Sequence, residues 1–246
     1  MSKLVSIIIP CFNAERWITE AIESCLNQTY NQVEIIVVDD GSTDRSLSLI
    51  QRFGDQITWV TGPNCGGNHA RNRGFHLSQG DYIQYLDADD YLYPDKISRQ
   101  VQHLETAGGD FVYGDWQYQY HKFGGRVFLD EVQISGTQSD MVESLLGLWW
   151  IATACPLYRR TTVEQVGGWD ESLRAAQDRD FLLSVVLAGA QATYQPGCVS
   201  VYRRYGNVTV STASTTQYVE SHLKVLQKLN NCWFTKAGLA RNIILL

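Results

Sequence analysis

The sequence lacks the features that mark several broad classes of protein. No apolar run approaches the roughly 20 residues that a helix needs to cross a bilayer, so we expect no membrane-spanning helix. Lysine and arginine together number 20 against 26 aspartates and glutamates, and the net charge of -6 gives no general basis for nucleic-acid binding. The six cysteines are dispersed, without a Cys-x-x-Cys pair or a histidine at metal-ligand spacing. These absences predict a cytoplasmic protein without a cysteine-bound metal, and the strand-like start of the chain predicts no signal peptide.

Short apolar strands and amphipathic helices alternate through residues 4–86. Strands are predicted at 4–9, 33–40, 57–62 and 82–86, and helices at 15–26, 44–53 and 66–78. Pro10 should stop the first strand, Asn13 should cap the first helix, and Ser42 or Thr43 should cap the second. The alternation is typical of a parallel sheet covered by helices on both faces, and such sheets bind ligands at the carboxyl ends of their strands. The polar loops that follow the four strands should therefore gather at one cleft.

The pattern becomes less regular beyond residue 110. The stretches FVYGDWQYQY and RVFLDEV predict antiparallel strands, and helices are predicted at 139–148 and 178–188. The tail from residue 215 predicts a further helix with an apolar stripe of Val219, Leu223, Leu226 and Leu229. One domain with a C-terminal helical extension is the simplest interpretation, because no repeat, linker or break in composition divides the chain.

Three carboxylates, Asp87, Asp89 and Asp90, crowd the end of the fourth predicted strand. Like charges this close repel, so either a positive group lies nearby or one aspartate takes up a proton. Asp87 and Asp89 can face the same side of an extended chain, whereas Asp90 points away or begins the next turn. Their oxygens suit Mg²⁺ or Mn²⁺. A solvated acidic turn is the alternative, and the position at the end of a parallel strand favours the metal.

The pair Asp39 and Asp40 ends the second predicted strand. It could start the turn and cap the next helix, or a carboxylate there could accept hydrogen bonds from a base edge or a ribose. Phe12, in the neighbouring loop, offers a ring face for stacking, and packing in the core is equally open for it.

Five stretches, taken in order, resemble a known family. They are VSIIIPCFNAERWITEAIESCLNQTY, EIIVVDDGSTDRS, NCGGNHARNRGF, GDYIQYLDADD and VGGWDESLRAAQDRDFLLSVVLAG. Their order and spacing over residues 4 to about 190 are similar to glycosyltransferase family 2, with its GT-A fold and DXD motif. The resemblance implies an α/β fold with a mostly parallel central sheet flanked by helices, a small antiparallel portion and a C-terminal helical extension. It also implies a metal-dependent, inverting hexosyltransferase-like enzyme that moves a sugar from a nucleotide-diphosphate sugar to a hydroxyl group.

The resemblance further implies roles for individual residues of a donor site. Pro10, Phe12 and Asp40 would lie against the nucleotide base. Asp87 would reach the ribose side, and Asp89 would hold Mn²⁺ or Mg²⁺ on the diphosphate.

Three arginines would complete that donor site. Arg71 occupies the family's donor-contacting position, although anchoring a helix to an acidic strand end would use the same charge. Arg203 and Arg204 lie in VYRRYGN at 201–207, where family members often carry a mobile donor-closing loop. A plain surface role remains open for each of these two.

The acceptor side is implied by residues after 148. Asp178 matches the general base, which must take the proton from the acceptor hydroxyl, while Gln177 stands where the family usually has Glu. Asp180 is interpreted as structural. Trp149 and Trp150 would pack in the core, form an acceptor platform or contact a lipid-linked acceptor.

The resemblance divides the chain and names its partners. Residues 1–214 would form the transferase domain, with 1–110 as the nucleotide-sugar-binding half and 111–214 as the acceptor and catalytic-base half, and 215–246 would be the extension. UDP is the preferred carrier by family frequency, with GDP and dTDP open. The acceptor would be a glycan or a lipid-linked molecule in polysaccharide or glycolipid synthesis, with peripheral contact at the inner membrane face. The Gln-x-x-Arg-Trp signature of processive enzymes is absent, which favours single addition.

Two other functions remain open. A sugar nucleotidyltransferase would also hold a nucleotide at such a sheet edge, but the first loop, PCFNAE, lacks the glycines and the basic residue that cradle a triphosphate. An inactive nucleotide- or carbohydrate-binding module is indicated only by Gln177, and Asp178 argues against it.

Overall fold

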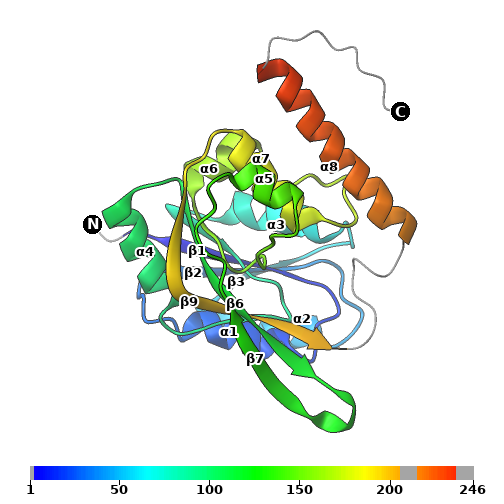
Figure 1. Cartoon of the computed structure of the whole chain (residues 1–246). Coiled ribbons are helices and arrows are strands. Elements are labelled where there is room, and N and C mark those ends of the chain that lie inside the picture. The colour runs from blue at the N-terminus through cyan, green and yellow to red at the C-terminus, as the bar shows by residue number, and fades with distance from the viewer. Residues whose placement is uncertain (1–2, 206–214, 237–246) are drawn as a thin grey trace.

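One nine-stranded sheet runs through the protein in the order β3-β2-β1-β4-β8-β6-β9-β5, with β7 paired to β6 (Figure 1). The computed structural model describes residues 3–205 and 215–236. The strands are β1 (Val5–Cys11), β2 (Val33–Asp39), β3 (Thr58–Thr61), β4 (Tyr82–Tyr85), β5 (Tyr91–Leu92), β6 (Phe111–His121), β7 (Val127–Gln133), β8 (Leu157–Arg159) and β9 (Ala192–Tyr205). The first four are parallel, with β1 between β2 and β4 and β3 beside β2. The predicted parallel sheet is confirmed.

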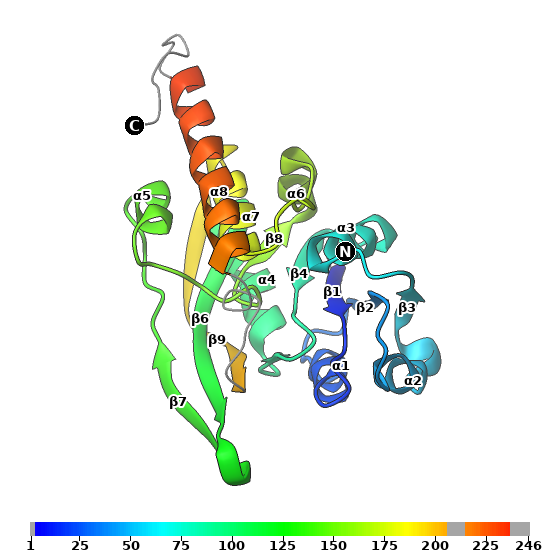
Figure 2. The same cartoon turned by 90° about the vertical axis from the view of Figure 1, so that its right-hand side faces the viewer.

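Helices cover both faces of this sheet. They are α1 (Ile18–Leu26), α2 (Ser46–Gln51), α3 (Gly67–Leu77), α4 (Lys96–Ala107), α5 (Met141–Leu146), α6 (Arg160–Val166), α7 (Gln177–Leu187) and α8 (Thr215–Lys236), with 3-10 turns at Gly54–Gln56 and Phe123–Gly125. Ile7 and Ile9 of β1 pack in the core layer under α1 and α4, and Ile8 packs in the layer that includes α6 and α7. This alternation follows from the two-residue period of a strand. Figure 2 shows α1 and α2 on one side of the parallel strands and α3 on the other.

The second half of the chain continues the same sheet. Strand β8 is antiparallel to both β4 and β6, so it joins the parallel strands to the long strand β6. Strand β6 pairs in parallel with β9 and, over its second half, antiparallel with β7. The β6–β7 hairpin extends away from the body of the protein (Figure 2). The predicted antiparallel portion is thus confirmed, whereas β8, α6 and β9 were not predicted.

The predicted helical tail is α8, but its apolar stripe is not the face that packs. Val225 is buried and Leu229 packs against the core beside α7, while Val219, Leu223 and Leu226 are 49%, 49% and 53% exposed. The stripe prediction therefore holds for Leu229 and is wrong for Val219, Leu223 and Leu226, because the contacts of α8 with α7 and the loop before it select a different side of the helix. In the part of the chain that the structure describes, no helix combines the length and the apolar character needed to cross a membrane.

Three local predictions in the first two loops are also wrong. Strand β1 continues through Pro10 to Cys11, because the Pro10 nitrogen faces the side on which β4 has already ended. Asn13 does not cap α1: its backbone is left-handed, with φ 49°, and its Oδ1 accepts a hydrogen bond from the Thr43 amide. Ser42 and Thr43 do not cap α2 either, since the Ser46 amide bonds to Asp44.

Candidate active site

The loops that follow the parallel strands are tied to one another. The Asn13 amide donates to Ser42 Oγ at 3.0 Å, which joins the loops after β1 and β2. The two oxygens of Asp40 accept hydrogen bonds from the amides of Cys65 and Gly66, both at 2.8 Å, which joins the loops after β2 and β3. The predicted convergence of these polar loops at one edge of the sheet is confirmed.

Asp40 and Phe12 differ in whether their side chains are available to a ligand. Asp40 is 5% exposed and both of its oxygens are engaged, so it holds the loop before α3 in place. Phe12 is 50% exposed, which excludes packing in the core and leaves its ring face available. Pro10 is partly buried beside it.

Each of the three crowded aspartates has its own surroundings, which reduce the repulsion among their charges. Asp87 accepts a hydrogen bond from Arg71 Nη2 at 2.6 Å. Asp89 accepts one from the Tyr205 hydroxyl at 2.9 Å, and burial together with the charge of Asp87 raises the pKa of its carboxyl group. Burial also raises the pKa of Asp90 well above its usual value, with the charges of Asp89 and Asp87 adding to the effect. The expected positive group is Arg71, and the raised pKa values of Asp89 and Asp90 favour their protonated forms, in the expected direction.

Arg203 lies inside the protein beneath the Asp89 loop. Its side chain is 0% exposed, forms an ion pair with Glu20 and donates to the Asp89 carbonyl at 2.8 Å. The guanidinium lies 4.8 Å from the ring centre of Trp17 and 4.7 Å from that of Tyr91. Such a buried, fully engaged arginine holds the loop in place, because it has no surface to offer a ligand.

Arg204 points the other way, since side chains alternate along β9. It is exposed and lies over the rings of Tyr118 and Tyr202, at 5.1 Å and 5.4 Å. Both arginines belong to a strand, so the prediction that they lie in a loop is wrong for them. Residues 206 and 207 of the predicted loop lie outside the described residues.

A chain of polar contacts joins the Asp89 loop to helix α7. Arg71 Nη2 contacts Asp87, and Arg71 Nη1 donates to Gln177 Oε1 at 3.2 Å. The guanidinium is stacked 4.5 Å from the ring centre of Trp169. Both alternatives for Arg71 therefore remain, because it anchors an acidic strand end at the edge of the candidate site. The amide of Gln177 serves as an acceptor here.

Asp178 lies in the first turn of α7, and each of its carboxylate oxygens accepts one hydrogen bond. Its Oδ1 accepts from the Arg179 amide at 2.8 Å, and its Oδ2 accepts from Trp150 Nε1 at 2.7 Å. Ala176, just before the helix, has a left-handed backbone with φ 53°, a conformation uncommon for a residue with a side chain. This turn sets the direction in which the side chain of Asp178 points.

Two other residues of this region, Trp149 and Asp180, have structural roles. Trp149 donates to the Ser135 carbonyl at 2.9 Å and packs edge-on against Tyr113, which is a structural role. Asp180 is buried and both of its oxygens lie 2.7 Å from Lys228 Nζ, as expected for a structural residue.

Tyr202 lies between the two halves of the site. Its ring packs on Trp150 at 5.6 Å, and burial together with the carboxyl groups of Asp90, Asp87 and Asp89 raises the pKa of its phenol. Tyr202 therefore contacts Trp150, the partner of Asp178, and lies within the electrostatic influence of the Asp89 loop.

A divalent cation fits the Asp89 position by charge. Burial and the neighbouring carboxylate make the ionised form of Asp89 unfavourable, and a cation would relieve this. Over residues 3–205 and 215–236, no group of three His, Cys, Asp or Glu side chains could hold a metal by itself. A bound ion would need ligands from a diphosphate and water, as Mg²⁺ commonly does.

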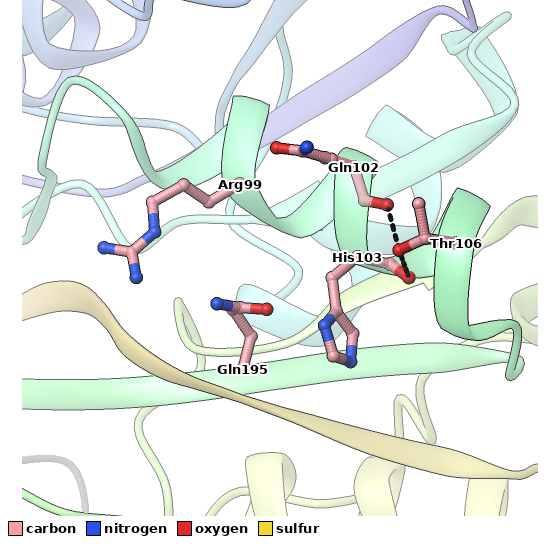
Figure 3. Close-up of a pocket in the computed structure, with 5 residues that line it drawn as sticks. All are labelled: Arg99, Gln102, His103, Thr106 and Gln195. Atoms are coloured by element: carbon pink, nitrogen blue, oxygen red, sulfur yellow. Dashed lines mark hydrogen bonds between the residues drawn. The ribbon is translucent and has the colours of Figure 1, made fainter.

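One surface hollow lies elsewhere. It has a volume of 290 Å³ and is lined by Arg99, Gln102, His103, Thr106 and Gln195, from α4 and β9 (Figure 3). None of the predicted site residues lines it, and its lining includes no carboxylate.

Comparison with solved structures defines the class of protein. A fragment of S. aureus TarS in complex with UDP-GlcNAc has a TM-score of 0.72 at 19% identity, covering 93% of this chain and 67% of that one. The mannosyltransferase PcManGT from Pyrobaculum calidifontis, in complex with GDP-Man and Mn²⁺, has a TM-score of 0.58 at 16% identity, covering 99% and 66%. The fold is therefore the predicted GT-A fold.

The family follows from the sequence comparison. The model of glycosyl transferase family 2 matches residues 6–167, and the chain belongs to this family. An Escherichia coli relative, the UDP-Glc:alpha-D-GlcNAc-diphosphoundecaprenol beta-1,3-glucosyltransferase WfaP, is 40% identical over 116 residues, which is 46% of each chain. The chain spans about half the length of the curated relatives it matches first.

Sequence reasoning missed three contacts of this site. They are the Tyr205 hydroxyl on Asp89, the Trp150 indole on Asp178 and the ion pair of Arg203 with Glu20. Each joins residues far apart in the chain, so no local spacing could have indicated it.

Proposed function

We propose that this chain catalyses inverting transfer of a sugar from a nucleotide-diphosphate sugar, UDP-linked by preference, to a hydroxyl group. The observation that carries the proposal is the chain of contacts from Asp87 through Arg71 to Gln177. It couples the aspartate loop to the helix that bears a candidate base. The family membership and the complexes of TarS and PcManGT with nucleotide sugars support it.

The donor would lie along the ends of β1, β2 and β4. Phe12, exposed at this edge, would stack on the base beside Pro10, and Asp40 would shape the base pocket through the loop it holds. Asp87 would face the ribose. Asp89 would hold Mn²⁺ or Mg²⁺, which when bound neutralises charge on the diphosphate oxygens. Metal dependence is supported by the charge balance at Asp89.

Asp178 would act as the general base. It takes the proton of the acceptor hydroxyl while that oxygen attacks the anomeric carbon from the face opposite the diphosphate. The bond from the anomeric carbon to the phosphate oxygen breaks, and the nucleoside diphosphate leaves with the electron pair. A single displacement of this kind inverts the anomeric configuration. Each oxygen of Asp178 has one protein donor and therefore keeps a lone pair for this proton.

The remaining predicted residues take different parts. We assign Arg204, which is exposed, to the departing diphosphate or the acceptor. Arg203 is assigned to holding the Asp89 loop, in place of the direct donor contact expected from the sequence. Gln177 would position Arg71 as a neutral partner.

The acceptor is proposed to be a glycan or a lipid-linked sugar in polysaccharide or glycolipid synthesis, with peripheral contact at a membrane face. The E. coli relative, named for a diphosphoundecaprenol-linked acceptor, supports this class. We also propose that residues 1–214 form the transferase domain, in the two halves predicted, and that 215–246 form an extension.

A panel of sugar nucleotides tests the proposal directly. We expect one donor to raise the melting temperature only with Mn²⁺, because a ligand of the native state stabilises it, and we expect the protein to release its nucleoside diphosphate. Asp178→Asn should remove turnover and spare donor binding, and Asp89→Asn should abolish Mn²⁺-dependent binding. Asp55→Asn, at an exposed position, is the matched control and should change neither.

The alternatives give different results in the same assays. A nucleotidyltransferase would form a nucleotide sugar from a sugar 1-phosphate and a nucleoside triphosphate. A binding module would bind a donor without releasing nucleoside diphosphate. Loss of donor binding in Asp178→Asn would make that residue a nucleotide ligand.

A further inference from the structure

We propose that Trp150 is a positioning residue for the base, holding the Asp178 carboxylate through its indole N–H. This inference rests on the proposed function and assigns Trp150 a role other than core packing or an acceptor platform. The contact is short, with Nε1 at 2.7 Å from Oδ2, and it joins the loop before β8 to the first residues of α7.

The indole N–H group is suited to positioning a carboxylate base. An indole N–H only donates, and it stays neutral across the pH range in which an aspartate works. It can fix one oxygen of the carboxylate without adding a cation, which would oppose proton uptake by the base. The Arg179 amide fixes the other oxygen, so rotation of the carboxylate is restrained at both atoms.

The ring of Trp150 is itself held. It meets Trp116 of β6 edge-on at 4.8 Å and Tyr202 of β9 at 5.6 Å. The indole therefore transmits the position of the sheet to the base on α7. Since Tyr202 also lies near the carboxyl groups of the Asp89 loop, one aromatic cluster spans both sides of the site.

The neighbouring tryptophan provides a matched control. Trp149 is also half-buried, packs on an aromatic ring and donates its N–H, but its acceptor is the Ser135 carbonyl. Trp149→Phe and Trp150→Phe thus remove the same atoms, and only one of them removes a donor to Asp178.

The first measurement needs no substrate. In ¹H–¹⁵N spectra, the indole signal lost in Trp150→Phe is that of Trp150, and Asp178→Asn should shift this signal more than that of Trp149. An unmoved Trp150 signal would show that the contact does not exist and would overturn the proposal.

The second measurement is nucleoside diphosphate release with donor affinity determined in parallel. Loss of a hydrogen bond to a charged group corresponds to a turnover about 10- to 100-fold lower in Trp150→Phe. Donor affinity should be unchanged, and Trp149→Phe should stay within about threefold of wild type. Equal turnover in the two variants, or a fall in donor affinity that accounts for the loss, refutes a positioning role. Absence of release by the wild-type protein is a different failure: it removes the proposed function, and this inference with it.

Discussion

Lys96 offers a prediction whose size follows from its surroundings. It begins α4, is fully buried, and its ammonium group donates to Gln84 Oε1 on β4. Gln84 in turn donates to the carbonyls of Tyr85 and Ala154, at 2.6 Å and 3.0 Å. The lysine thus supports the end of the strand that leads into Asp87. Among the residues that the structure describes, no carboxylate forms an ion pair with it, and burial lowers its pKa from 10.5 to about 8.

This lowering has a definite sign and size. An unfolded chain holds the lysine proton up to a higher pH than the folded chain, so folding is penalised while the buried group is charged. The penalty is complete below pH 8, about 3 kcal/mol, and disappears as the pH rises from 8 towards 10.5. Between pH 7 and pH 9 the change in charge of Lys96 alone should add about 1 kcal/mol to the free energy of unfolding.

The assay is urea unfolding of the wild type and Lys96→Met at several pH values. We expect the free energy of unfolding of the wild type to rise by about 1 kcal/mol relative to the variant between pH 7 and pH 9. Loss of the Gln84 partner adds a constant that cancels in this comparison, as do the thiols and tyrosines common to both proteins. Lys3→Met, at a partly exposed lysine, is the control. A stability difference that does not change with pH would refute the assignment of a buried, charged lysine.

Three further predictions concern the contacts that sequence reasoning missed or left open. Tyr205→Phe should raise Mn²⁺ affinity by about threefold to tenfold, because the ion no longer competes with a hydroxyl for Asp89. Electron paramagnetic resonance of free Mn²⁺ measures this affinity, and a weaker affinity in the variant would show that the tyrosine hydroxyl supports metal binding. Arg203→Met should lower the free energy of unfolding by about 3 kcal/mol through lost hydrogen bonds and ring contacts, and a neutral result in urea unfolding would contradict its role under the loop. Lys228→Met should cost about 2 to 3 kcal/mol at pH 7, because Asp180 is left buried without a cation. Since burial raises the pKa of Asp180, this deficit should shrink as the pH falls to 5, and a deficit that grows in acid would exclude the mechanism.

Sequence alone determined the part of the fold in which neighbouring residues carry the information. Apolar runs ending in polar loops predicted β1 to β4 and the order of their helices, because β1, β2 and β4 are largely buried on both faces and polar residues follow where each strand reaches the edge of the sheet. The crowding of Asp87, Asp89 and Asp90 predicted a positive group or a bound proton; the structure places Arg71 on Asp87, and burial with the neighbouring charges raises the pKa of Asp90.

Only the tertiary structure decided which side chains face the site. Arg203 and Arg204 are adjacent in sequence. Because both lie in strand β9, their side chains point to opposite faces, that of Arg203 inward to Glu20 and that of Arg204 to the surface. Trp150 reaches Asp178 because packing of its ring on β6 and β9 places it there. Such contacts depend on sheet register and on helix docking, which are set by the sum of many distant contacts and leave no trace in local spacing.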